Sequence, residues 1–336
     1  MPLLKTFLLL NCFLFTGFAF AQPGPIFQQD IKTDITLPAE AGKNAVKLFQ
    51  SNGQLICVTS TGVFRYHSGK WAGHKQSSDL TTAALDLSGN VWYASAQAIY
   101  AEKPEKKFSQ PPFSQKDTIL TLFWETSTKL FVGTNNGLFI WDGQWTPSVH
   151  VKECRVTGIA VDAQGQLYAA TNRGLWRRTH QGWTNLDESL MAVGNKQTYF
   201  ALTANRNGQD IVYASPWSVG CIAGDGNHWV LKATDGLPYG PVTVLTPTQS
   251  GFWMGTKKGA IKKETNWQYY NGKRWLPDNQ VNDILVIDSL TVWIATPQGI
   301  SQIKRKSMLL EEKANTFENI INLRHNRRGL VNHSQL

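Results

Sequence analysis

The sequence predicts an all-β protein, a seven-bladed β-propeller followed by a short C-terminal α-helix. Three observations predict this fold. One short motif recurs seven times at even spacing, apolar strands and Gly, Asn and Asp turns flank each copy, and a helical period replaces this pattern from Ser307. The 13 Trp, 9 Tyr and 16 Phe among 336 residues agree with it, because aromatic residues favour sheets.

The N-terminal 21 residues are predicted to form a signal peptide. Lys5 supplies the positive charge, an apolar run follows at 7–18, and Ala19 and Ala21 favour cleavage before Gln22. The apolar run is too short for a membrane-spanning helix. We therefore expect a periplasmic or secreted protein whose mature chain has no membrane span.

Three cysteines remain after the predicted cleavage: Cys57, Cys154 and Cys221. An odd number at wide spacing is neither a disulfide framework nor a metal motif. We expect three buried, free thiols, and no cofactor or metal ion is predicted.

Each copy of the motif contains two or three apolar residues, a small residue, a polar turn and usually a Gly that opens the next strand. The copies lie at residues 55–62, 91–98, 130–137, 167–174, 211–218, 252–259 and 292–299. The small fourth residue, such as Gly133 or Gly255, should let neighbouring blades approach closely. The Gly after the polar turn should adopt a positive φ angle, which is cheap only for Gly.

A Trp recurs near the last strand of several blades, at Trp71, Trp145, Trp183 and Trp229. We expect these rings to pack between blades, since each buries a large area; the alternative is a sugar-stacking surface. The seventh repeat ends short of a fourth strand, so residues 31–37 are predicted to supply it and to close the ring. The expected organisation is a signal peptide over 1–21, a propeller over 22–306, and a helix and tail over 307–336.

The sixth repeat carries the most specific resemblance to a known family. Residues 235–238 (DGLP), the apolar strand 242–245 and residues 252–259 (FWMGTKKG) resemble the two-component regulator propeller repeat. The resemblance covers about residues 45–305 and is weakest in the second and fifth repeats. It implies an exported, ligand-sensing propeller of the kind found in receptors that respond to polysaccharide fragments. The membrane helix and kinase sequence that usually accompany such propellers are missing here.

The C-terminal segment has an amphipathic helical period, with Ser307 as the predicted N-cap and Arg324, Arg327 and Arg328 near the predicted end. The segment 310–331 is similar to a linker between such propellers and a following α-helical domain in larger exported bacterial proteins. The alternative is a simple C-terminal helix.

A ligand is expected at one mouth of the propeller channel, where loops of all the blades converge. Two sets of loops should meet there: the polar turns inside the motif and the segments that precede the innermost strands. The candidate ligand-binding residues are Asn135, Asn136, Arg155, Arg173, Trp217, Lys257, Lys258 and Asn282.

Cations dominate these loops, and the chain has a formal net charge of +9, so an anionic oligosaccharide, uronate-bearing or sulfated, is the predicted ligand. Residues 302–328 contribute part of that charge, and exposed Lys at turns is also ordinary solvation. A protein partner is the other candidate. No nucleic-acid recognition motif is present.

No sequence motif demands catalysis. We therefore predict a non-catalytic ligand-binding or interaction propeller. The alternative is a carbohydrate-active enzyme, a polysaccharide lyase or hydrolase, or the propeller part of one, with His150, Arg155 and Tyr239 as the first candidates. A scaffold for other protein domains is a third reading.

Overall fold

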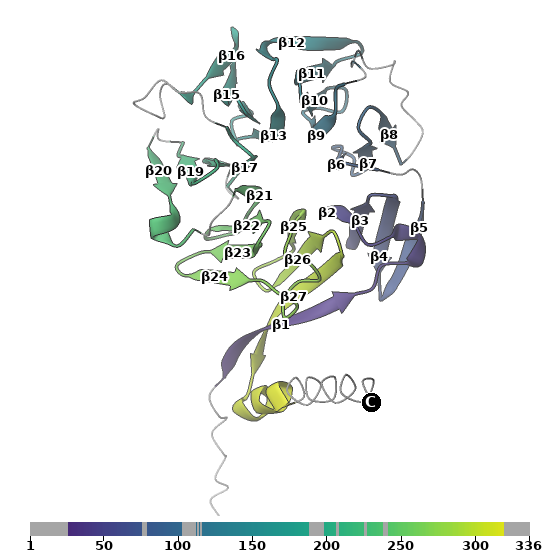
Figure 1. Ribbon diagram of the computed structural model, residues 1–336, viewed down its shortest axis with the longest axis vertical. Coiled ribbons are helices and arrows are strands. Elements are labelled where there is room, and N and C mark those ends of the chain that lie inside the picture. Colours follow the sequence, from purple (N-terminus) through teal and green to yellow (C-terminus); the bar gives the residue numbers. More distant parts are fainter. Residues whose placement is uncertain are drawn as a thin grey trace, which may run out of the picture. The chain divides into compact units, whose positions relative to one another are not determined.

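The computed structural model describes residues 26–75, 79–102, 112, 114, 116–187, 198–205, 208–224, 227–237 and 241–318. The predicted signal peptide therefore lies outside the described residues. Within the described part, the strands form seven antiparallel sheets arranged as a ring of blades (Figure 1). The predicted seven-bladed propeller is confirmed.

The first strands of neighbouring blades contact one another around the ring, so the blades radiate from these innermost strands. From the innermost strand outward, the blades are blade 1, β2 (Ala45–Ser51), β3 (Gln54–Thr59), β4 (Gly62–His67) and β5 (Lys70–Lys75); blade 2, β6 (Thr82–Leu85), β7 (Val91–Ala94) and β8 (Ile99–Ala101); blade 3, β9 (Ile119–Trp124), β10 (Leu130–Thr134), β11 (Gly137–Trp141) and β12 (Trp145–Lys152); blade 4, β13 (Val156–Val161), β14 (Leu167–Thr171), β15 (Gly174–Thr179) and β16 (Gly182–Asn185); blade 5, β17 (Ala201–Ala204), β18 (Ile211–Ala214), β19 (Val219–Ile222) and β20 (His228–Leu231); blade 6, β21 (Val242–Pro247), β22 (Phe252–Thr256), β23 (Gly259–Lys263) and β24 (Trp267–Tyr270); and blade 7, β25 (Asp283–Val286), β26 (Thr291–Thr296), β27 (Gly299–Met308) and β1 (Phe27–Ile35).

Blade 7 is closed as the repeat count predicts, by a strand from the other end of the chain. β1 pairs with β27 and completes the sheet as its outermost strand. The closing strand is Phe27–Ile35, which is shifted toward the N-terminus from the predicted 31–37. Because the first and last strands share one sheet, unravelling from either end must first break this sheet.

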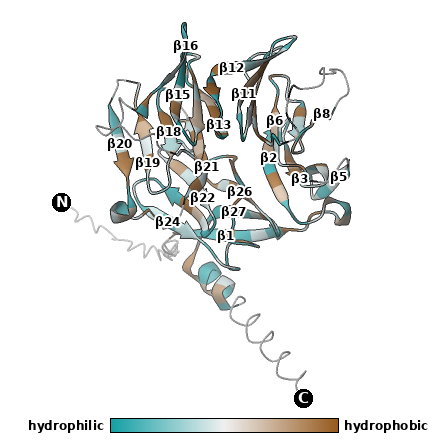
Figure 2. Ribbon diagram, turned by 45° about the horizontal axis from the view of Figure 1, so that its top comes forward, coloured by the Kyte–Doolittle hydropathy of each residue, from teal (hydrophilic) through white to brown (hydrophobic). Residues whose placement is uncertain are grey.

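The core lies between the blades, and hydrophobic residues follow strands such as β11 and β13 (Figure 2). The small fourth residue of the motif allows this packing. A Cβ on Gly133 would lie 2.8 Å from Cγ1 of Val156 in blade 4, and one on Gly255 would lie 2.6 Å from Cγ1 of Val281. Both distances are shorter than a van der Waals contact, so only a residue without a side chain fits.

The Gly after the polar turn has the expected positive φ in four repeats, including 141° at Gly137 and 133° at Gly259. The three cysteines are buried and free, as predicted. Burial raises the pKa of all three thiols, that of Cys221 to about 12, which keeps them protonated at neutral pH.

The recurring Trp residues divide into two groups. Trp183 is 7% exposed and meets Phe131 of blade 3 edge to face, as the inter-blade prediction requires. Trp71 and Trp145 are half-buried against aromatic rings of their own blades. Trp229 is 40% exposed, although its ring stacks on Phe252 of the next blade.

The predicted N-cap is wrong. Ser307 belongs to β27, and its hydroxyl accepts a hydrogen bond from Nε2 of Gln28 at 2.8 Å. The helix occupies 310–318, and Glu312 caps it by accepting from the backbone N–H of Leu309 at 2.9 Å. Strand pairing decides this boundary, which local helix signals cannot show. The predicted helix end at Arg324 to Arg328 lies outside the described residues.

Residues Asp30–Arg305 form one compact unit, and the described residues 26–29 and 306–318 belong to a second. In the second unit, Nζ of Lys313 lies 4.6 Å from the centre of the Phe27 ring. Among the described residues, no helix is long and apolar enough to cross a membrane.

Candidate functional site

Each blade presents two kinds of turn at opposite ends of its strands. In blade 6, Val242 at the start of the first strand pairs with Thr256 at the end of the second, and Thr256 pairs with Gly259 at the start of the third. The turns between second and third strands therefore share one end with the segments that enter the first strands. We call this end the mouth face. The opposite face carries the other turns of each blade.

The mouth turns are closed by a buried threonine. Oγ1 of Thr256 donates to the carbonyl of Gly259 at 2.8 Å and accepts from the N–H of Lys258 at 2.9 Å. The same two bonds occur in four other blades, at Thr59, Thr134, Thr171 and Thr296. Because this threonine satisfies the turn, the two side chains between it and the Gly are free to point into solvent. Sequence analysis noted the Gly but missed the threonine, although its recurrence at one motif position was visible.

The structure places all the described ligand-binding candidates on the mouth face. Seven of them are exposed: Asn135, Asn136, Arg155, Arg173, Trp217, Lys257 and Lys258. Asn282 is half-buried, and its Nδ2 donates to the carbonyl of Ala45 at 2.7 Å and to Oδ1 of Asn44 at 3.0 Å. It thus links blade 7 to blade 1.

Asn135 has a structural part. Its Oδ1 accepts from the N–H of Thr118 at 2.7 Å, and its Nδ2 donates to the carbonyl of Lys116 at 3.1 Å. Asn172 repeats the first of these bonds to the N–H of Arg155 in blade 4. These asparagines tie each mouth turn to the segment that enters the first strand of the same blade.

Most cations of the mouth face are available to a ligand. Of the described residues there, Lys43, Lys116, Arg155, Lys257 and Lys258 are exposed and form no ion pair. Arg173 approaches Glu153 only at 3.9 Å. In Figure 1 these loops come from blades all around the ring.

Several carboxylates of the same face are already used inside the protein. Asp117 is 4% exposed and accepts from the N–H of Ser114 at 2.7 Å. Asp283, 8% exposed, pairs with Lys47 at 3.0 Å and accepts from the N–H of Leu48 at 2.8 Å. Glu40, Asp79, Glu153 and Asp235 are exposed there, fewer than the exposed cations. The mouth face is therefore electropositive.

The catalytic candidates are not brought together by any contact of the described residues. His150 is exposed on β12, the outermost strand of blade 3, where its ring packs against Gly182 of blade 4; a Cβ on that Gly would lie 2.5 Å from Cε1. Arg155 lies in the segment that enters blade 4, and no hydrogen bond or ion pair joins it to His150. Tyr239 lies outside the described residues.

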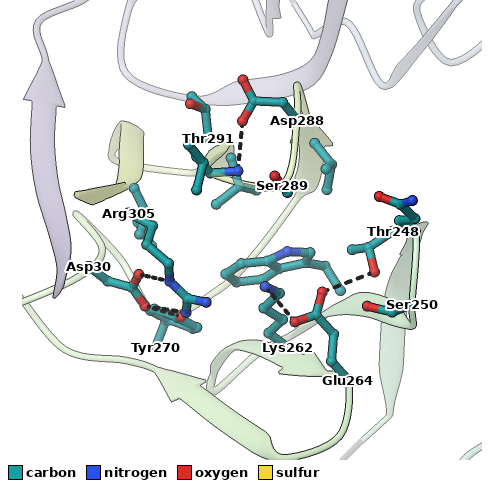
Figure 3. A pocket seen from close by; sticks show the side chains of 16 residues that line it. Asp30, Thr248, Ser250, Lys262, Glu264, Tyr270, Asp288, Ser289, Thr291 and Arg305 are labelled. Carbon is teal, nitrogen blue, oxygen red and sulfur yellow. Dashed lines mark hydrogen bonds and ion pairs between the residues drawn. The ribbon is translucent and has the colours of Figure 1, made fainter. Parts of the chain in front are cut away.

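The opposite face contains a pocket of about 250 Å³ between blades 6 and 7 (Figure 3). Arg305 binds Asp30 through Nε at 2.8 Å and Nη2 at 3.2 Å, and Tyr270 donates to Asp30 at 2.7 Å. Lys262 pairs with Glu264 at 2.8 Å. Figure 3 shows Asp288, Ser289 and Thr291 across the pocket from these two pairs. Sequence analysis gave no indication of this pocket.

Both ion pairs in the pocket are stable in their charged forms. Burial raises the pKa of the Asp30 carboxyl, but the hydrogen bonds from Arg305 and Tyr270 outweigh it and hold the pKa below its usual range. At Glu264, burial is likewise outweighed by Lys262, so its pKa is also lowered. The hydrogen bond to Asp30 raises the pKa of Arg305. Within the described residues, no group of three or more His, Cys, Asp and Glu side chains could hold a metal ion.

Solved structures share this fold at low sequence identity. The extracellular domain of a one-component system from B. thetaiotaomicron is 15% identical, with a TM-score of 0.66 over 81% of this chain and 39% of that one. The extracellular domain of a hybrid two-component system from the same organism is 17% identical, with a TM-score of 0.64 over 81% of this chain and 40% of that one. This chain thus spans about two fifths of those domains.

A catalytically inactive virginiamycin B lyase from Staphylococcus aureus, solved with quinupristin, is 12% identical, with a TM-score of 0.68 over 82% of this chain and 99% of that one. No protein-family model and no curated protein sequence matches this chain. The chain is a β-propeller that resembles sensor extracellular domains and a lyase propeller, and at these identities the likeness concerns the fold alone.

Proposed function

We propose that this chain is an exported, non-catalytic propeller of the two-component regulator type that binds anionic oligosaccharides, uronate-bearing or sulfated, at its mouth face. The observation that carries the proposal is the set of exposed cations there that pair with no carboxylate. Guanidinium and ammonium groups bind carboxylate and sulfate oxygens through charge-assisted hydrogen bonds. The cations come from several blades, which suits an extended ligand.

The extracellular origin of two of the similar structures supports export, and the predicted signal peptide agrees with it. The non-catalytic part rests on the placement of His150 on an outermost strand, away from the segments that enter the first strands. A lyase or hydrolase would need an acid or base within hydrogen-bond reach of its substrate.

The test is calorimetric titration of the mature chain with sulfated, uronate-bearing and neutral oligosaccharides of equal length, with product analysis of every sample. A variant with Lys257→Gln and Lys258→Gln should lose about tenfold in affinity for the anionic sugars. The matched control is Lys70→Gln with Lys304→Gln, which removes equal charge from two exposed cations of the opposite face. This control should bind within about twofold of the parent.

Three results would contradict the proposal: no binding of any anionic sugar, equal losses in both variants, or preference for neutral sugars. Shortened or unsaturated products would move the assignment to the enzyme alternative.

A further inference from the structure

The aromatic residue at the second position of the motif usually has a carboxylate partner in its own blade. Nε1 of Trp92 donates to Oδ2 of Asp86 at 3.0 Å, and the hydroxyl of Tyr168 donates to Oδ2 of Asp162 at 3.3 Å. Each Asp opens the turn between the first and second strands. A buried aromatic donor of this kind normally requires an acceptor.

Blade 6 breaks this pattern. Its turn contains Thr248, Gln249 and Ser250, and no Asp precedes Trp253 as Asp86 precedes Trp92. Trp253 is 4% exposed, lines the pocket between blades 6 and 7, and its Nε1 makes no hydrogen bond to the described residues. Nε1 is also absent from the fully buried unpaired atoms, so it faces the pocket. The pocket therefore contains an unused donor.

The charges of the pocket do not balance. Arg305 and Lys262 are paired with Asp30 and Glu264, which leaves the third carboxylate, Asp288, without a cation among the described residues. Asp288 is exposed and accepts only from the N–H of Leu290, at 2.7 Å. A hydrogen bond from an uncharged N–H stabilises the carboxylate but does not cancel its charge.

The rest of the opposite face has the same sign. Asp86, Asp142, Asp162 and Asp210 form no ion pair with described residues, and hydrogen bonds from Trp92 and the backbone outweigh burial to lower the pKa of Asp86. Arg65, Lys129, Arg178, Lys262 and Arg305 are each paired with a carboxylate. The negative charge thus extends from the pocket across several blades, which favours an extended cationic partner over a small amine.

We propose that the pocket between blades 6 and 7 receives a Lys or Arg side chain from a basic segment of a protein partner. The cation faces Asp288, and a main-chain carbonyl of the same segment accepts the hydrogen bond of Trp253 Nε1. The cavity of about 250 Å³ suits one long side chain. The remaining basic residues of the segment meet the unpaired carboxylates of the opposite face.

The test uses fluorescence anisotropy with a labelled peptide of alternating lysine and serine, and the same peptide with glutamine for lysine. Asp288→Asn keeps the shape and removes the charge, so the lysine peptide should bind about tenfold more weakly. Trp253→Phe keeps a ring and removes the N–H, and should weaken binding about threefold to tenfold. The matched control is Asp142→Asn, an exposed carboxylate of the same face outside the pocket; it should stay within about twofold.

Trp253→Phe could perturb the core, so the ¹⁵N shift of the indole N–H of the parent protein provides a second measurement. It should move on addition of the lysine peptide and not of the glutamine peptide. Equal losses in Asp288→Asn and Asp142→Asn would mean diffuse attraction and would overturn the pocket assignment. Free lysine competing as well as the peptide would replace the protein partner by a small amine. Absence of lysine-peptide binding would overturn the inference outright, while Lys257→Gln with Lys258→Gln should leave this binding intact, so the two proposals fail independently.

Discussion

The mouth face and the opposite face of the propeller carry the same types of charged residue in different bonding states. On the mouth face, Lys257 and Lys258 are exposed and unpaired, while buried acids such as Asp283 are satisfied internally. On the opposite face, Arg305 and Lys262 are paired, and Asp288 has no cation among the described residues. The formal charge of +9 conceals this separation.

The chemistry of the turns explains the difference. A mouth turn is closed by a neutral threonine and a Gly, so its outward positions carry no structural duty and can hold cations. Several turns of the opposite face are instead closed by Asp86 or Asp162, whose carboxylates accept backbone N–H groups. A propeller with these two turn types therefore acquires faces of opposite sign without any change in its core.

The largest loss of stability should come from the paired charges of the opposite face. Asp30→Asn breaks the contacts with Arg305 and should lower the free energy of unfolding by about 2–3 kcal/mol at neutral pH, because the guanidinium is left half-buried without its partner. Tyr270→Phe, which removes a single hydrogen bond to Asp30, should cost less. Chemical denaturation measures both.

The sign of the pH dependence follows from the lowered pKa of Asp30 in the folded state. Its stabilisation is present above the unfolded-state pKa of about 3.9 and is lost as the pH falls through the lower folded-state value. The stability difference between the parent and Asp30→Asn should therefore shrink below about pH 4. A difference that persists unchanged at lower pH would show that the Asp30–Arg305 pair is not its origin.

A smaller loss is expected on the mouth face, and it should come from the neutral residue. Thr256→Val removes both turn bonds at a site that is 2% exposed and should cost about 1–2 kcal/mol. Lys257→Gln, one residue away, should change the free energy of unfolding by less than about 0.5 kcal/mol. If the lysine substitution proved as costly as the threonine one, Lys257 would be part of the fold and not a residue free for binding.

Features with a local cause could be predicted from the sequence. The positive φ of Gly259 and the need for a small residue at Gly255 follow from one motif repeated seven times, and the missing last strand predicted the closure by the N-terminal segment. The cationic mouth loops followed from the same repeat, because motif position fixes the face on which a turn lies.

Features that join distant segments could not be predicted. Asp30 and Arg305 are 275 positions apart, and Tyr270 reaches them from another blade. The unpaired donor of Trp253 becomes visible only when blade 6 is compared with blades 2 and 4 in three dimensions. The misplaced helix start at Ser307 has the same origin, since pairing with Gln28 extends β27 past the expected cap.

Hydrogen–deuterium exchange with a sulfated oligosaccharide tests most directly whether the mouth face is the anion-binding one. Slower exchange is expected in the mouth turns, at Asn135–Asn136 and Lys257–Lys258, and unchanged exchange in the opposite turns, at Asp162–Gly165 and Thr248–Gly251. Protection confined to the opposite turns, or absent from both sets while the sugar is bound, would contradict the account.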